Sequence, residues 1–302
     1  MIPATQSDPT TSDISEDKPP TPLWRRYLLL LAKLAFMAGA LWLVARHLDL
    51  AQLVLTLRQA QPGWLLVATA LFIVSKLIAS VRLNHFFRAI DLSLSEGYNL
   101  RLYWVGMYYN LFLPGGIGGD GYKVYLLGQR FPGRRTAIFR ALLLDRLSGM
   151  LALLVLLLLL FAGTDFPGWW RVGAVALVPL GLGLSYGLGR WGFGEFRSAF
   201  GRTSWQALGV QGSQVLCAWA LLLALGQGSG PVLPYLLVFL ASSIAAVLPL
   251  TVGGLGAREL TFFYGAKLFS LNAPVAVSIS VLFYVVSAAV SLIGAFIKIE
   301  KK

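Results

Sequence analysis

The chain has only one cysteine and two histidines among its 302 residues, and only 13% of its residues are charged. A single cysteine can form neither an internal disulfide nor a cysteine metal cluster. With only two histidines, we also expect no histidine-based metal site, and we expect no cofactor. Soluble domains carry roughly 25% charged residues. Because 57% of the residues are hydrophobic, a soluble form could not cover its surface with polar groups. Composition therefore excludes a soluble enzyme and predicts a membrane protein.

Acidic residues are also scarce, at 13 against 25 basic residues, which leaves a net charge of +12. A strongly basic chain is often a nucleic-acid-binding protein. Here the basic residues occur in short clusters between apolar runs, and no nucleic-acid-binding motif accompanies them. The charge pattern therefore indicates membrane topology, and we expect no nucleic-acid partner.

Long apolar runs dominate what is present. A helix that crosses a bilayer needs about 20 mostly apolar residues. Residues 1–24 lack such a run and are rich in Ser, Thr, Pro and Asp, which is typical of a disordered tail rather than a signal peptide. Residues 25–302 are predicted to form one transmembrane domain. Its expected full spans are 27–45, 64–82, 141–162, 172–189, 205–226 and 275–297.

Two further apolar regions, 102–128 and 232–269, are each interrupted by a glycine-rich break. The breaks read LPGGIGGDG (113–121) and LPLTVGGLGARE (248–259). Broken helices survive at membrane depth only where protein or a water-filled cavity covers their polar backbone. The half-helices after the breaks, 121–129 and 257–269, are too short to cross at 1.5 Å per residue. We therefore predict two re-entrant hairpins.

The basic residues predict the orientation. Placing the N-terminus inside puts sixteen lysines and arginines in cytoplasmic segments and three outside, as the positive-inside rule requires. Both termini are then cytoplasmic in a bacterial-type inner membrane. The hairpins open to opposite sides, so the halves, about 25–164 and 165–302, run in opposite directions. The predicted fold is an all-α membrane bundle built as an inverted repeat.

The two breaks hold the candidate binding residues, because ionisable groups at membrane depth are costly and usually face a cavity or one another. Helix N-termini after the breaks also favour an anion such as phosphate. The first break supplies Asn110, Pro114, Gly115, Gly116, Gly118, Gly119, Asp120 and Lys123, and the second supplies Pro249, Gly253, Gly254, Gly256, Arg258 and Glu259. Secondary candidates are Lys76, Asp145 and Arg146.

A structural explanation competes with each of these assignments. Glycine and proline also permit tight helix packing in membranes, and the charges could pair without any ligand. Lys76 either lines a cavity or pairs with an acid, whereas Asp145 and Arg146, at the start of a span, favour an interfacial ion pair.

The motifs NLFLPGGIGGDGYKVYLL and LPLTVGGLGARE resemble the paired motifs of the lysylphosphatidylglycerol synthase transmembrane family, which includes the flippase half of the multiple peptide resistance factor. The resemblance covers nearly all of the chain after residue 25. It implies a domain that moves or accommodates a lipid with a charged head group. Lys123 stands where the family often has arginine, and lysine lacks the bidentate fork for phosphate. The chain ends at Lys302, so we expect no aminoacyltransferase domain and no enzymatic synthesis of the lipid.

The leading hypothesis is a flippase-like protein for a charged phospholipid or polyprenyl-linked lipid. No Walker motif is present, so we expect no ATPase in the chain. Arg258 and Lys123 would hold the phosphate, while Asp120 and Glu259 pair with these bases or meet a cationic part of the head group. Two alternatives remain. One is a non-transporting membrane partner of a lipid-modifying enzyme or glycosyltransferase, and the other is an intramembrane enzyme with Asp120 and Glu259 as its acid–base candidates.

Overall fold

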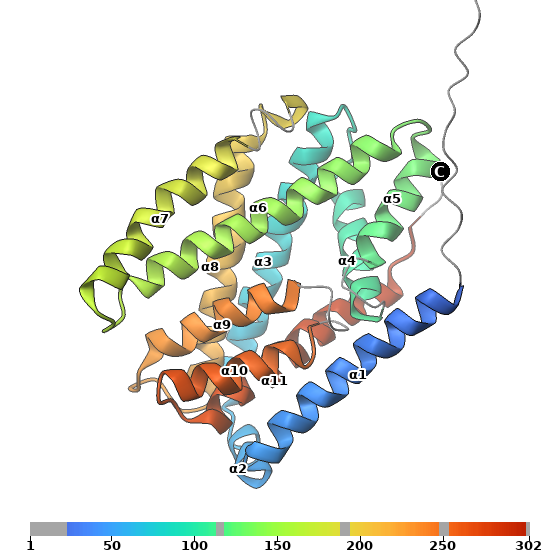
Figure 1. Ribbon diagram of the computed structural model, residues 1–302. Helices are drawn as coiled ribbons and strands as arrows, with labels where there is room; N and C mark the ends of the chain where they lie inside the picture. The colour runs from blue at the N-terminus through green and yellow to red at the C-terminus, as the bar shows by residue number, and fades with distance from the viewer. Residues whose placement is uncertain (1–22, 113–117, 188–193, 248–253, 300–302) are drawn as a thin grey trace, which may run out of the picture.

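The structure, a computed structural model, describes residues 23–112, 118–187, 194–247 and 254–299, which are mainly helical and contain no strand. The helices are α1 (Leu23–His47), α2 (Leu50–Arg58), α3 (Pro62–Ala89), α4 (Glu96–Phe112), α5 (Gly118–Arg130), α6 (Arg135–Phe161), α7 (Gly168–Gly187), the 3-10 turn η2 (Gly194–Phe196), α8 (Phe200–Ala224), α9 (Val232–Val247), α10 (Ala257–Leu268), α11 (Ala273–Leu292) and its 3-10 extension η3 (Ile293–Phe296). Figure 1 shows their arrangement.

Within the described residues, four helices are long and apolar enough to cross a membrane, namely α3, α6, α8 and α11 with η3. The bent pair α1 and α2 would make a fifth span. Helices α7 and α9 are also apolar but offer shorter stretches, Gly168–Leu184 and Val232–Val247. The predicted all-helical, multi-pass membrane fold is confirmed at this level.

Several boundaries differ from those expected. Helix α1 begins at Leu23, inside the predicted tail of residues 1–24. Helix α3 continues to Ala89, well past its expected end at residue 82, because its last turns are buried against neighbouring helices. No helix was predicted over the residues of α2. The Asp49 side chain accepts a hydrogen bond from the Gln52 backbone N–H at 3.0 Å, so an N-cap starts α2, and the chain turns by 92° between α1 and α2.

Both predicted broken regions are helix pairs. Helix α4 packs on α5 around the first break, and α9 packs on α10 around the second. The half-helices after the breaks span Gly118–Arg130 and Ala257–Leu268, close to the predicted 121–129 and 257–269. The two members of each pair are therefore in contact with each other.

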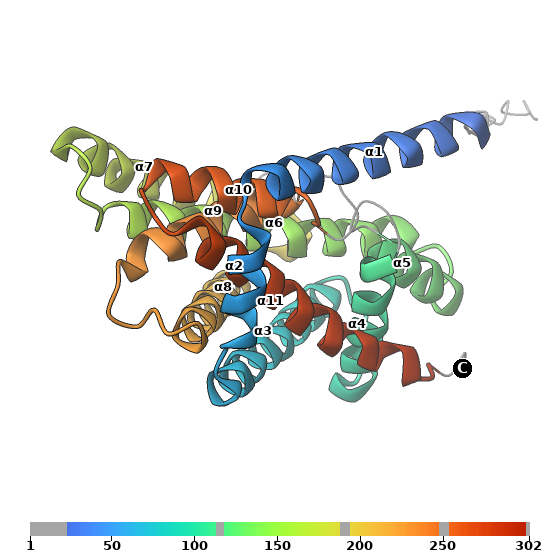
Figure 2. The ribbon, with the colours of Figure 1, turned by 90° about the horizontal axis from the view of Figure 1, so that it is seen from below.

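Packing contacts repeat between the two halves of the chain. In the first half α3 packs on α4 and α6, and in the second half α8 packs on α9 and α11. Across the halves, α6 packs on α9 as α11 packs on α4, and α3 lies against α8 (Figure 1). Helix α1 departs from the pattern, because it lies along one edge of the bundle against α10 (Figure 2). The contacts therefore indicate two structurally related halves.

A cluster of phenylalanines fills the bundle between α3, α9 and α11. The Phe283 ring meets Phe72 edge-on at 5.5 Å between centroids and Phe239 at 4.9 Å. Such edge-to-face contacts add about 0.5–1.5 kcal/mol per pair beyond area burial. All three rings are almost completely buried. Two cations of the candidate site described below contact these rings, Lys76 over Phe72 and Arg258 over Phe283.

Candidate functional site

At the first break, α4 and α5 touch backbone to backbone. A Cβ atom at Gly119 would overlap the Gly106 carbonyl group, and one at Gly106 would meet the Lys123 side chain. The Asn110 side chain accepts a hydrogen bond from the Gly119 backbone N–H at 2.8 Å and so caps the start of α5. Gly106 was missed by sequence reasoning, because it lies within an ordinary apolar stretch of α4, outside the motif.

Asp120 is the centre of a charged cluster that joins α5 to α6. Its carboxylate accepts from Lys123 Nζ at 3.2 Å and from Arg146 Nε at 2.5 Å. The Lys123 ammonium also lies over the Tyr103 ring, 4.7 Å from its centroid. The side chains of Asp120 and Lys123 are only 15% and 5% exposed. Lys123, one of the two bases predicted to hold the phosphate, is therefore already paired with an acid, which it shares with Arg146.

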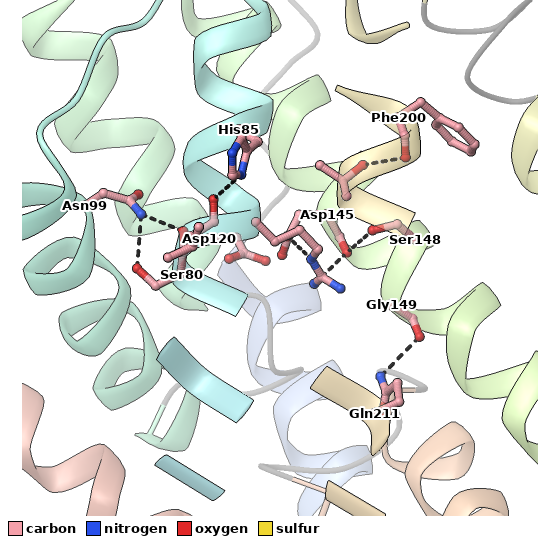
Figure 3. A network of polar contacts seen from close by, with 12 residues as sticks. Ser80, His85, Asn99, Asp120, Asp145, Ser148, Gly149, Phe200 and Gln211 are labelled. Carbon is pink, nitrogen blue, oxygen red and sulfur yellow. Dashed lines mark hydrogen bonds and ion pairs between the residues drawn. The ribbon is translucent and has the colours of Figure 1, made fainter. Parts of the chain in front are cut away.

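Asp145 does not pair with its neighbour Arg146, as an ion pair at the start of a span would suggest. It pairs with Arg82 of α3, whose Nε lies 2.8 Å from the Asp145 carboxylate. Arg82 also donates to the Asp145 backbone carbonyl at 3.1 Å. Figure 3 shows this region, where the Gln211 side chain also donates a hydrogen bond to the Gly149 backbone carbonyl at 3.1 Å. Arg82 had been placed at the cytoplasmic end of a span, but the extra length of α3 buries it.

At the second break, two glycines shape the start of α10. Gly254 and Gly256 both have φ of +85°, a region that favours glycine. The Glu259 carboxylate accepts from the Gly256 backbone N–H at 2.6 Å and from the Ser280 hydroxyl at 2.9 Å. Glu259 is therefore a buried helix cap. It is turned toward Gly256 and Ser280 rather than into an ion pair with Arg258.

Arg258 and Lys76 line one cavity of about 290 Å³ between α3, α4, α9 and α11. The Arg258 guanidinium lies 4.7 Å from the centre of the Phe283 ring, and Lys76 Nζ lies 4.5 Å from that of Phe72. Arg258 Nη1 is buried without a hydrogen-bond partner among the described residues. Lys76, a secondary candidate that could either line a cavity or pair with an acid, lines the cavity.

A second cavity of about 210 Å³ is lined by the charged residues of the first break and of α6. The two cavities share Tyr103, Met107 and Asn110 of α4 and Val247 of α9 as walls. Described residues of both breaks thus line two adjoining cavities. Of the remaining predicted residues, Gly118 begins α5, and Pro114, Gly115, Gly116, Pro249 and Gly253 lie outside the described residues.

In the described part of the chain, no group of three or more His, Cys, Asp or Glu side chains could hold a metal ion. The chemistry of the two cavities is instead that of paired and unpaired charges in an apolar bundle. Such an arrangement can bind a charged head group, because intramembrane ionisable residues usually mark ligand or ion pathways.

Residues 30–205 match the family described as the lysylphosphatidylglycerol synthase TM region. The chain belongs to this family. The matched region contains the Asp120 cluster, the Arg82–Asp145 pair and Lys76, whereas Arg258 and Glu259 lie beyond it. The residues that match this family therefore include nearly all that line the cavity at the first break and part of those that line the cavity at the second.

The chain is also similar to the glycosyltransferase AglD of Haloferax volcanii. The two are 23% identical over an alignment that covers 89% of this chain and 54% of that protein. The chain thus spans about half the length of this curated relative. The likeness includes most of the helical bundle, since it extends well past the residues of the family match.

Proposed function

We propose that this protein binds and translocates a charged phospholipid or polyprenyl-linked lipid across a bacterial-type inner membrane, without an ATPase of its own. The observation that carries the proposal is the pair of adjoining polar cavities, which both chain breaks line inside an apolar bundle. A charge facing lipid costs on the order of 2.5–3.5 kcal/mol on insertion scales. Seven charged side chains that line the two cavities therefore favour a ligand path. They are Lys76, Arg82, Asp120, Lys123, Asp145, Arg146 and Arg258.

The proposed topology has six full spans, two re-entrant hairpins of opposite orientation and both termini in the cytoplasm. The repeated packing of the halves supports it, since inverted repeats place their binding site where the halves meet. Cysteine-accessibility mapping tests it with little background, because Cys217 is fully buried. Labelling of a cysteine placed after Lys298 only from the outer side would contradict the proposed orientation.

The test of activity is reconstitution of the full chain into liposomes that contain a fluorescent phospholipid or polyprenyl-linked lipid. We expect faster transbilayer movement than in protein-free liposomes. Arg258→Ala should abolish it, and Arg258→Lys should retain part, because the charge remains but the bidentate fork is lost. If a broad panel of lipids shows no movement with folded protein, translocation is refuted.

A second function is a membrane partner of a lipid-modifying enzyme or glycosyltransferase, without transport. The likeness to part of a glycosyltransferase supports it. This alternative predicts that the protein co-purifies with such an enzyme and raises its activity on lipid substrate. Enhancement of the enzyme by Arg258→Ala protein to the same extent as by wild type would argue against a role for the cavity in this partnership.

A further inference from the structure

The cavity at the second break carries positive charge only. Its charged lining residues are Lys76 and Arg258, and its other polar lining groups are hydroxyls and one amide. No carboxylate is among the described residues that line it. Since Phe72 and Phe283 are in contact, the two cations lie over a single aromatic cluster.

The nearby carboxylates are already engaged elsewhere. Glu259 follows Arg258 in the chain, but its two oxygens accept from Ser280 and Gly256, and the residue is only 4% exposed. Asp145 is paired with Arg82. Asp120, in the adjoining cavity, is held by Lys123 and Arg146. Each of the three carboxylates therefore already has a cationic or hydrogen-bonding partner, and none of them lines the cavity of Lys76 and Arg258.

The two cations, by contrast, lack an acidic partner. Among the described residues, no carboxylate lies within 4 Å of the Lys76 ammonium or the Arg258 guanidinium. Arg258 Nη1 is buried and has no hydrogen-bond partner in the part of the chain that the structure describes. Stacking over aromatic rings compensates only in part, by about 2 kcal/mol for a desolvated cation. An anion placed between them would satisfy both.

We infer that this cavity selects lipids whose phosphate head group carries no cation, with the phosphate bridging Lys76 and Arg258. The inference rests on the proposed function and narrows its substrate class. A lysyl or ethanolamine head group would bring an ammonium next to two like charges, with no carboxylate among the described residues that line the cavity to accept it. Exclusion by unpaired like charge is an effective source of specificity. Both an anionic phospholipid and a polyprenyl phosphate have the required chemistry.

The experiment measures binding separately from transport. Purified full-length protein in detergent is mixed with phosphatidylglycerol, phosphatidylethanolamine, lysylphosphatidylglycerol or a polyprenyl phosphate, and native mass spectrometry gives each apparent affinity. We expect either anionic lipid to bind at least about tenfold more tightly than the two amine-bearing lipids, a difference of about 1.4 kcal/mol. The ratio between phosphatidylglycerol and polyprenyl phosphate identifies which source of phosphate the site prefers.

Variants assign the selectivity to the cavity. Lys76→Gln and Arg258→Gln should each weaken binding of the preferred anionic lipid about tenfold. Lys267→Gln serves as the matched control, because Lys267 lies on the same helix as Arg258 but is exposed and stacks on Phe263 outside the cavity. Lys76→Glu should raise the affinity for lysylphosphatidylglycerol. If that variant does not fold, the neutral Lys76→Gln still decides the matter.

Equal or tighter binding of lysylphosphatidylglycerol by the wild type would overturn the inference, as would unchanged affinity in Lys76→Gln. The proposed function fails separately. Selective binding of anionic lipid without transbilayer movement would refute translocation and leave the selectivity standing. Rapid movement of lysylphosphatidylglycerol in liposomes would refute the selectivity and leave translocation standing.

Discussion

The contact between α4 and α5 leads to a prediction with a built-in control. Gly119→Ala places a methyl group onto the Gly106 backbone, and a backbone cannot give way as a flexible side chain does. Overpacking of this kind costs about 1–3 kcal/mol, occasionally more. Two residues along the same helix, a Cβ at the exposed Gly121 would meet nothing within 4 Å. Gly121→Ala should therefore stabilise α5 by roughly 0.5–1 kcal/mol.

The two substitutions should thus differ by about 1.5–4 kcal/mol, with opposite signs relative to the wild type. Unfolding of a membrane protein in detergent is often irreversible, so the assay compares variants under one heating protocol. Each sample is heated, and the fraction that remains monodisperse is measured by size-exclusion chromatography. A Gly119→Ala variant as heat-resistant as Gly121→Ala would refute the backbone contact on which the first break is built.

Two further predictions concern the buried charges. Arg82→Met leaves the Asp145 carboxylate buried without its partner, which should destabilise the protein by roughly 3–5 kcal/mol. The double variant with Asp145→Leu should recover most of that loss. Strictly additive effects of the two substitutions in the same heating assay would contradict direct pairing. Glu259→Ala removes the cap of α10 and should cost about 1 kcal/mol, whereas Glu259→Gln keeps an oxygen for the Gly256 N–H and should cost less. Equal losses for both Glu259 variants would show that its charge, not its acceptor, holds the helix.

Much of the fold was predictable from the sequence because membrane solvation acts locally. With no water in the bilayer core, each spanning segment must be long, apolar and helical, so composition and run length predicted an all-helical membrane protein. Proline and glycine likewise predicted the two breaks, and the helices that follow them start at Gly118 and Ala257, within a few residues of the expected positions. Helix α2 was missed because nine residues are too few to stand out against a loop.

The partners of the charged side chains could not be predicted in the same way. The sequence by itself determined which residues are ionisable and that they lie in an apolar chain, and those facts made Asp120, Lys123 and Arg258 candidates. Asp120 and Lys123 lie three residues apart on α5, so their contact is local. Only the packing of α3, α5 and α6 decided that Asp120 also pairs with Arg146 and that Asp145 pairs with Arg82. The packing of α3, α9, α10 and α11 likewise places Lys76, far from either motif in sequence, in the wall of the same cavity as Arg258. Ion pairing depends on distances between helices that are remote in sequence, and those distances exist only once the bundle has formed.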